Sequence, residues 1–218
     1  MKMLQPFLGM VLSLVLVAPG IAAGTQGPRQ VVQGTAETVL AEVTRLKEEL
    51  EADSSLIYPL VERTVLPHFD FTTMTRSAMG RFWRKASSQQ QRRVVAEFQE
   101  LLVRTYATAL LGYSGQKIEY PPMNFADGAR EVMVPTKITA AGGPPIPINY
   151  RLHIVDQDEK WLVYDVVIDG ISLVTNYRST FARLIRMGGA GEKDRSRRMS
   201  AGIDNLIQAL SNKNDKQA

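Results

Sequence analysis

Two β-strands and the turn between them are predicted by residues 146–168, which read IPINYRLHIVDQDEKWLVYDVVI. The first part alternates apolar and polar side chains, as a strand with one buried and one exposed face does. Its apolar set is Ile146, Ile148, Tyr150, Leu152 and Ile154, and its polar set is Asn149, Arg151 and His153. Residues 160–168 are apolar on both faces, so this strand is expected to be central or covered. The acidic turn at 156–159 makes the pair a hairpin.

The sheet extends to the residues before this hairpin. Residues 130–140 alternate with Val132, Val134, Thr136 and Ile138 on one face, and GGPP at 142–145 supplies the next turn. Residues 116–120 are expected to form a shorter first strand. Strands that follow one another through short turns pair in antiparallel fashion. We therefore predict a small twisted antiparallel sheet of about four strands.

Helical periodicity dominates both ends of the chain. Apolar residues recur at three- and four-residue spacing in the segments 28–51, 54–67, 70–80, 88–112, 172–186 and 197–211. Asp70 and Ser172 stand where helix N-caps are expected, and Gly80 stands where a helix should stop. Ser88 and Gln91 have capping-box spacing. The predicted fold class is therefore α+β, with about six or seven helices wrapped around the sheet.

The first residues have the pattern of a secretory signal peptide. Lys2 gives a positive start, residues 7–17 are an apolar run, and 18–24 form a small-residue cleavage zone. The run is shorter than the about 20 apolar residues that cross a bilayer, which favours cleavage after Ala22 or Ala23 over an uncleaved anchor. We expect an exported, periplasmic protein. Its signal peptide is expected at residues 1–23, a single domain at residues 28–211 and a flexible tail at residues 212–218.

Composition excludes several kinds of functional site. The 218 residues contain no cysteine, which removes disulfides, thiolate metal sites and cysteine nucleophiles, and they contain only two histidines. The sequence has no P-loop, nucleophile elbow, dinucleotide fingerprint or zincin motif. We therefore expect neither a metal nor a cofactor. The net charge of +4 is a weak indication of anionic partners.

One carboxylate and one basic cluster leave alternatives open. Asp165 lies inside an apolar strand, where a carboxylate is costly unless it is paired. It is either a general base or, as we favour, a partner of Arg178, Lys160 or a helix N-terminus. A basic cluster surrounds Trp83, and export argues against nucleic acid as its partner. Two interpretations of this cluster remain open. It is either a binding face for an anionic partner or for lipid headgroups, or simply a solvated surface. Its residues are Arg81, Arg84, Lys85, Arg92 and Arg93.

The sequence contains more apolar side chains than any functional site identified in it requires. The apolar sheet face must be covered, and the segment from Phe69 to Trp83, with its aromatic and methionine residues, is the best candidate to cover it. Methionine adapts to irregular surfaces, so nine of them suit a pocket for flexible chains. A packed core explains the same pattern. Pattern alone thus predicts an exported α+β domain and leaves open whether it holds a hydrophobic cavity.

Two stretches of the chain resemble the MlaC family, also called toluene-tolerance proteins. The first is LIYPLVERTVLPHFDFTTMTRSAMGRFWRKASSQQQRRVVAEFQELLVRTYATALLGYSGQKIEY, residues 56–120. The second is WLVYDVVIDGISLVTNYRSTFARLIR, residues 161–186, followed by glycines and an amphipathic helix. The resemblance covers nearly all of the chain after the leader. Its most specific pieces carry no catalytic motif, so they identify a scaffold.

The resemblance implies a periplasmic lipid carrier in which sheet and helices enclose a cavity for the acyl chains of phospholipid. It implies two partners: an outer-membrane lipoprotein complex and the substrate-binding component of an inner-membrane ABC transporter. Such carriers maintain the lipid asymmetry of the outer membrane, and a related branch is associated with hopanoids. Phospholipid is then cargo and not a cofactor, no nucleic acid is expected, and the chain is expected to be a monomer that contacts membrane proteins transiently.

The expected lipid-binding wall combines one strand face with the most aromatic helical segment. Its residues are Phe69, Met74, Met79, Phe82, Leu101, Tyr106, Val132, Val134, Ile148, Tyr150, Leu152, Val163, Tyr164 and Val166. Three kinds of function remain open at this point: a lipid carrier of either branch, a small exported cone-shaped α+β enzyme that uses Asp165, and an adaptor with a packed core.

Overall fold

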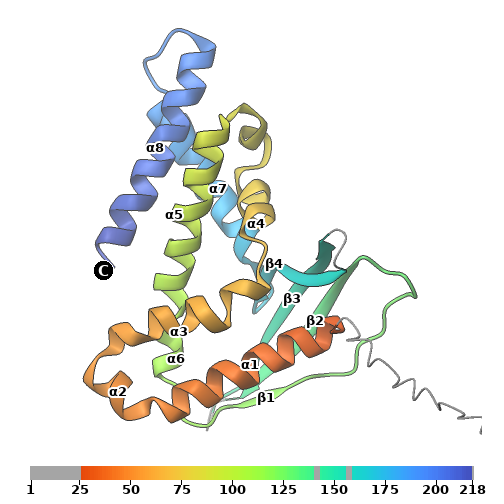
Figure 1. Cartoon of the computed structure of the whole chain (residues 1–218). Helices are drawn as coiled ribbons and strands as arrows, with labels where there is room; N and C mark the ends of the chain where they lie inside the picture. Colours follow the sequence, from red (N-terminus) through yellow and green to blue (C-terminus); the bar gives the residue numbers. More distant parts are fainter. Residues whose placement is uncertain (1–25, 140–142, 156–158, 218) are drawn as a thin grey trace, which may run out of the picture.

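The computed structural model describes residues 26–139, 143–155 and 159–217. The signal peptide predicted at 1–23 lies outside these residues. The molecule is a sheet end joined to a helical end (Figure 1). Helix α1 crosses in front of the sheet, and α4, α5, α7 and α8 rise away from it. None of the helices in the described ranges is long and apolar enough to cross a membrane.

The sheet is antiparallel throughout, as the alternation predicted. Five strands appear in the described residues, in the order β1-β2-β3-β4-β5. Their bounds are Lys117–Glu119, Glu131–Thr139, Ile146–Val155, Lys160–Ile168 and Ile171–Ser172. The fifth strand has only two residues, and the expectation of about four did not include it.

A β-bulge changes which residues of β4 share a face. Arg151 pairs with Asp165, but the next residue of β3, Leu152, pairs with Val163, so β4 carries one extra residue here. A bulge shifts the alternation of side chains by one position. Val163 and Val166 therefore join the same buried cluster despite their odd spacing. This explains why β4 is apolar on both faces in the sequence.

The helices lie in the predicted segments, but several segments are divided and the last two helices extend beyond their predicted bounds. Their bounds are α1 Pro28–Arg45, α2 Lys47–Ala52, α3 Ile57–Thr64, α4 Phe71–Met79, α5 Ser88–Tyr106, α6 Thr108–Leu111, α7 Leu173–Gly188 and α8 Arg195–Asp215. Three short 3-10 helices connect them: η1 Ser54–Leu56, η2 Leu66–His68 and η3 Gly80–Lys85. The segment 28–51 breaks at Leu46, and this turn lets Leu50 pack in the same cluster as α3.

Helix caps follow the sequence closely. Asp70 accepts a hydrogen bond from the Thr73 N–H at 2.8 Å and so begins α4. Gly80 ends that helix with a φ of +54°, a conformation that glycine adopts without strain. The capping box of α5 uses Ser87 and Gln90, and not Ser88 and Gln91 as predicted. The run SSQQQ offers both pairs at the same spacing, so spacing could not separate them.

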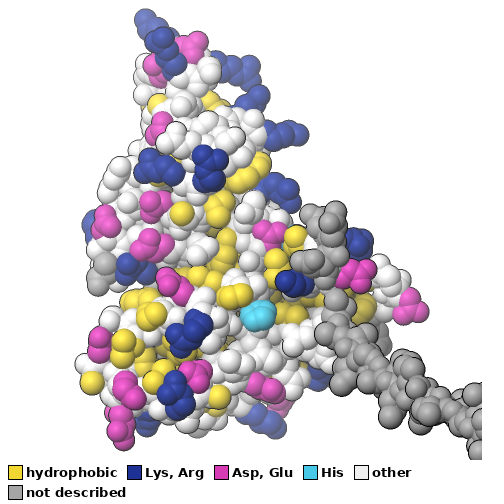
Figure 2. Space-filling model, viewed as in Figure 1, with side chains coloured by type: hydrophobic (Ala, Val, Ile, Leu, Met, Phe, Trp, Pro, Cys, Tyr) yellow, Lys and Arg dark blue, Asp and Glu magenta, His cyan; other side chains and the backbone are white. Residues whose placement is uncertain are grey.

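The last two helices pack closely through glycines. An added Cβ at Gly202 of α8 would overlap the carbonyl oxygen of Ile185, and one at Gly188 would overlap the side chain of Asn205. Gly188 is the last residue of α7, and Gly189 and Gly191 lie in the turn that connects α7 to α8. In the view of Figure 2 the surface of this end carries many lysine and arginine side chains.

Helix α8 also ends later than predicted. It continues through Asp215, so the tail expected to be flexible from residue 212 is helical for most of its length. The cause is Asn214, which is buried and donates hydrogen bonds to the backbone oxygen and the carboxylate of Glu97, both at 3.0 Å. These bonds tie the end of α8 to α5.

Buried apolar residues form three clusters. The helical cluster joins α4, η3, α5, α7 and α8. The sheet cluster joins the inner face of the sheet to the first turn of α1 and to α7. The corner cluster joins the rest of α1 to α2, α3 and the end of α5. Helix α1 thus spans two clusters and covers the sheet between them.

Candidate functional site

The inner face of the sheet is the apolar surface on which the candidate site is built. Register places Val132 opposite Leu152 and Val134 opposite Tyr150, so these side chains share one face. Helix α1 contacts β2 and β4, and its Val31 and Val32 belong to the sheet cluster. A helix laid across an apolar sheet face shields it from water, which is the main source of stability for such a layer.

Burial is uneven along this face. Leu152 is fully buried, Ile148 and Tyr150 on the same strand are only partly buried, and Ile146 at the start of the strand is exposed. Burial nevertheless raises the pKa of the Tyr150 phenol to about 12. The apolar surface around Tyr150 is therefore largely sheltered by protein atoms but not completely covered by them.

Helix α1 has small side chains where it passes over this region. Val32, Thr35 and Val39 lie on one stripe at three- and four-residue spacing. The hydroxyl oxygen of Thr35 is buried without a hydrogen-bond partner among the described residues. The part of α1 that passes over the sheet therefore carries small side chains, one of which has this unsatisfied hydroxyl group.

The structure divides the predicted lipid-binding residues between two clusters. The strand residues come together in the sheet cluster as Val132, Val134, Leu152, Val163 and Val166, with Ile148 and Tyr150 packed against them. The helical residues Met74, Met79, Phe82 and Leu101 belong to the helical cluster. Phe69 packs against both and forms a parallel bridge with Val163. The expected single wall is therefore two walls that meet at Phe69.

Two of the predicted residues lie apart from both clusters. Tyr106, at the end of α5, is 38% exposed. Tyr164 is the extra residue of the bulge and has no pairing partner on β3. The centre of its ring lies 5.0 Å from that of His153, whose side chain points away from the sheet cluster. Strict alternation placed Tyr164 with Val166, and the bulge separates them. The lipid-binding role of the whole set stays a prediction.

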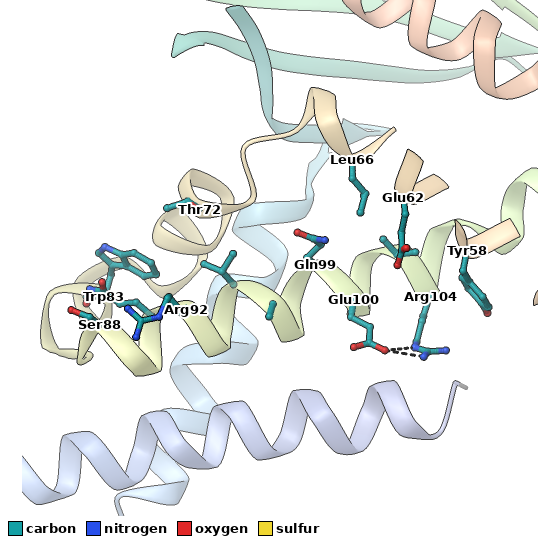
Figure 3. A pocket seen from close by; sticks show the side chains of 14 residues that line it. Tyr58, Glu62, Leu66, Thr72, Trp83, Ser88, Arg92, Gln99, Glu100 and Arg104 are labelled. Carbon is teal, nitrogen blue, oxygen red and sulfur yellow. Dashed lines mark hydrogen bonds and ion pairs between the residues drawn. The ribbon is translucent and has the colours of Figure 1, made fainter. Parts of the chain in front are cut away.

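A groove of about 640 Å³ runs along α5, and sequence reasoning did not identify it (Figure 3). Helix α3 borders one end of the groove and α4 with η3 the other. On the α5 side, the groove is lined by residues at three- and four-residue spacing, among them Arg92, Ala96 and Val103. This spacing is visible in the sequence. Glu100 and Arg104 form an ion pair of 2.8 Å at its edge. The side chains that line it are Tyr58, Glu62, Leu66, Thr72, Trp83, Ser88, Gln91, Arg92, Val95, Ala96, Gln99, Glu100, Val103 and Arg104.

Asp165 is held as a structural carboxylate. Its side chain is 4% exposed and accepts hydrogen bonds from the Ser172 hydroxyl at 2.7 Å and from the Val174 N–H at 3.2 Å. Arg151 lies 3.5 Å away. The helix N-terminus considered as its partner is observed, because Ser172 caps α7 and Val174 lies in its first turn. Arg178 instead binds the Ser77 carbonyl.

The two histidines do not form a metal site. His153 Nε2 lies 3.0 Å from the Asp70 carboxylate. Hydrogen bonds from Thr73 and the nearby His153 outweigh burial and hold the pKa of Asp70 below its usual value. Burial lowers the pKa of His68. The described residues contain no group of three or more metal-binding side chains.

Comparison with known proteins gives consistent matches. The family model described as MlaC protein matches residues 33–212. The toluene tolerance protein Ttg2D of Pseudomonas putida is 31% identical over 179 residues, which are 81% of this chain and 82% of that protein. The intermembrane phospholipid transport system binding protein MlaC of Haemophilus influenzae is 23% identical over 82% of this chain and 84% of its own.

A solved structure matches the fold as well. It is the phospholipid-binding protein from Ralstonia solanacearum, determined in complex with a phospholipid, and it superposes with a TM-score of 0.76 at 29% identity. The match covers 88% of this chain and 99% of the other. The α+β architecture described above is therefore shared along almost the whole of that protein.

Proposed function

Because this chain belongs to the MlaC protein family, we propose that it is a periplasmic phospholipid carrier. Three observations support the proposal. The sequence begins with a pattern typical of secretory leaders. Its relative from Haemophilus influenzae is named as the binding protein of an intermembrane phospholipid transport system. The structure from Ralstonia solanacearum holds a phospholipid in the same fold.

The observation that carries the assignment is the partly buried apolar surface around Tyr150 on the inner face of the sheet. Acyl chains need apolar surface that is sheltered from water but not already filled. We take this surface to be that of Ile148 and Tyr150 on β3, which are partly buried and pack against the same cluster as Val31 and Val32 of α1. We place the acyl chains there, with Phe69 at the junction where they could extend toward the helical cluster.

A carrier of this kind lowers the barrier to moving lipid through water. Two acyl chains expose about 30 methylenes, each worth about 0.8 kcal/mol on burial, so a free lipid is held in its membrane by on the order of 20 kcal/mol. The carrier needs a comparable apolar environment and no buried clamp for the headgroup. Tail recognition is then loose, since one methylene discriminates weakly. This fits a protein that takes lipid from one membrane and gives it to another.

The finer role follows from the family. We propose that the chain exchanges phospholipid with an outer-membrane lipoprotein complex and with the inner-membrane transporter, and so helps to maintain outer-membrane asymmetry. A role as an enzyme is disfavoured by Asp165, whose carboxylate is occupied by the first turn of α7. No cofactor is needed for carriage.

Lipid extraction from the purified protein tests the proposal directly. The protein is isolated without detergent, extracted with organic solvent and analysed by mass spectrometry. We expect phospholipid in a near-stoichiometric amount. Finding a hopanoid instead would support the carrier function with a different lipid as its cargo. A clean extract, together with failure to take up phospholipid from vesicles, would contradict the carrier and favour an adaptor.

The proposed compartment has its own test. Cleavage after Ala22 or Ala23 predicts a mature N-terminus at Ala23 or Gly24. Sequencing the N-terminus of protein from the periplasmic fraction checks this. A chain that keeps Met1 and sediments with membranes would instead indicate an uncleaved anchor.

A further inference from the structure

Positive charge is concentrated at one end of the molecule, near η3 and the start of α8. Residues 81–93 contain five lysine and arginine residues and no carboxylate, and residues 183–198 contain six against Glu192 and Asp194. These segments together have a net charge of +9, whereas the whole chain has +4, so the remainder is net −5. Gln90 of α5 binds the Ser200 carbonyl of α8 at 3.1 Å, which brings both segments to this end (Figure 2).

A pocket of about 570 Å³ lies within this basic end. Four exposed cations line it, and Phe82 and Met199 form its apolar part; the cations are Arg81, Arg84, Lys85 and Arg195. None of the ion pairs between described residues involves any of these four side chains. Unneutralised like charges repel and oppose compact structure. A cluster of this kind is therefore suited to an anion from outside the chain.

Apolar side chains accompany the cations. Met187, in the last turn of α7, is 60% exposed, and Arg183 Nη1 lies 3.8 Å from its sulfur. The Arg81 guanidinium lies 5.0 Å from the centre of the Phe82 ring. Surfaces that mix arginine or lysine with apolar side chains match the headgroup region of a bilayer, where phosphates meet the first methylenes.

We propose that this basic end docks on the surface of an anionic lipid bilayer. The arginine and lysine side chains contact phosphate groups, and Met187 reaches toward the acyl boundary. We favour a layer of lipid headgroups over an acidic protein because apolar side chains, among them the exposed Met187, accompany the cations. The net negative remainder of the chain would then turn the sheet end away from the membrane.

This inference is independent of the proposed cargo. Binding to the surface of a bilayer concerns η3 and the α7–α8 end, whereas carriage concerns the inner face of the sheet. Loss of lipid from the extract would leave docking intact, and loss of docking would leave the extract unchanged. The two proposals can therefore fail separately.

Vesicle sedimentation tests the docking surface. The purified chain is mixed with vesicles of phosphatidylcholine, or of phosphatidylcholine with about one-third phosphatidylglycerol, in low and in high salt. We expect binding to the anionic vesicles at low salt and its loss in high salt. A triple variant, Arg81→Gln with Arg84→Gln and Lys85→Gln, should bind roughly a hundredfold more weakly, since each cation near an anionic surface contributes about fivefold.

A matched variant removes the same charge from the sheet end. Lys117→Gln with Arg130→Gln and Lys137→Gln changes three exposed cations there and should bind nearly as wild type does. Arg195→Gln with Arg197→Gln, on α8, provides a second test of the docking end that leaves η3 untouched. The melting temperature of each variant establishes that it is folded.

Several outcomes would overturn the proposal. Equal binding to neutral vesicles would show that charge does not direct the contact. Equal loss in both triple variants would show that only net charge matters. Absence of binding to anionic vesicles at low salt would leave an acidic protein as the partner of this end and would refute the bilayer.

Discussion

The Asp165 carboxylate accepts a hydrogen bond of 2.7 Å from the hydroxyl of Ser172, and Ser172 also caps helix α7. One carboxylate thereby joins the last long strand of the sheet to the first turn of the helix that leaves it. Hydrogen bonds to carboxylate oxygens are shorter and stronger than those between neutral groups. The contact fixes the direction in which α7 enters the helical end.

Replacing Asp165 is expected to destabilise the fold. Asp165→Ala leaves the Val174 N–H and the Ser172 hydroxyl without their acceptor, so the free energy of unfolding should fall by about 2–4 kcal/mol. Urea denaturation measures this. Asp127→Ala, which changes an exposed carboxylate in a loop, should stay within about 0.5 kcal/mol of wild type. Similar losses in both variants would refute the structural role.

Alanine substitutions at two helical glycines should have opposite effects on stability, because only one of the glycines lies in a close helix contact. Gly202→Ala forces a methyl group against the Ile185 carbonyl and should cost about 1–3 kcal/mol or more. Gly34→Ala in α1 has free space and should stabilise by about 0.5–1 kcal/mol, because alanine is the better helix former. Thermal unfolding of both variants checks the prediction. A stabilised Gly202→Ala would mean that the helices are less closely packed.

Tyr150 should make stability depend on high pH. Its pKa is raised to about 12 by burial, so the neutral phenol is favoured in the folded state. The resulting stability is complete below the unfolded pKa near 10 and is lost as pH rises through about 12; two pKa units correspond to about 2–3 kcal/mol.

Tyr150→Phe removes this dependence, so the difference in stability between wild type and variant should shrink between pH 10 and 12. Absorbance of the tyrosinate form should show one tyrosine fewer titrating late in the variant. Identical titration curves would contradict the deep position of the phenol.

A bulky ring beside Tyr150 should displace lipid without unfolding the chain. Ile148→Trp places an indole on the half-buried inner face, where excluding three or four methylenes weakens retention roughly a hundredfold. Met133→Trp is the matched change, since Met133 is 51% exposed on the neighbouring strand and on the outer face. Lipid retained after purification and the melting temperature are measured together. A folded Ile148→Trp protein with a full lipid load would place the acyl chains elsewhere.

Local patterns predicted the elements well because they depend on neighbouring residues. The alternation of β3 and the apolar run of β4 predicted the bounds that the structure shows for these strands. Asp70 and Ser172 cap the helices that were expected to follow them. Each of these signals lies within a few residues of the structure that it determines. The family resemblance then extended them to a fold that the comparisons share.

Features that depend on distant partners were not predictable in this way. The bulge that moves Tyr164 to the outer face is visible only from the pairing of β4 with β3. The close contacts of Gly188 and Gly189 with residues of α8 are likewise visible only once both helices are in place. The division of the expected cavity wall at Phe69 depends on how the two ends of the molecule meet, and no single segment records it.

The link between Asn214 and Glu97 has a consequence for the order of events during synthesis. The helical cluster contains Phe98 of α5 and Leu210 of α8, which are separated by more than half of the chain. Until the last residues of α8 leave the ribosome, α5 lacks the neighbour that buries one of its sides. The helical end is therefore completed only when translation is nearly finished.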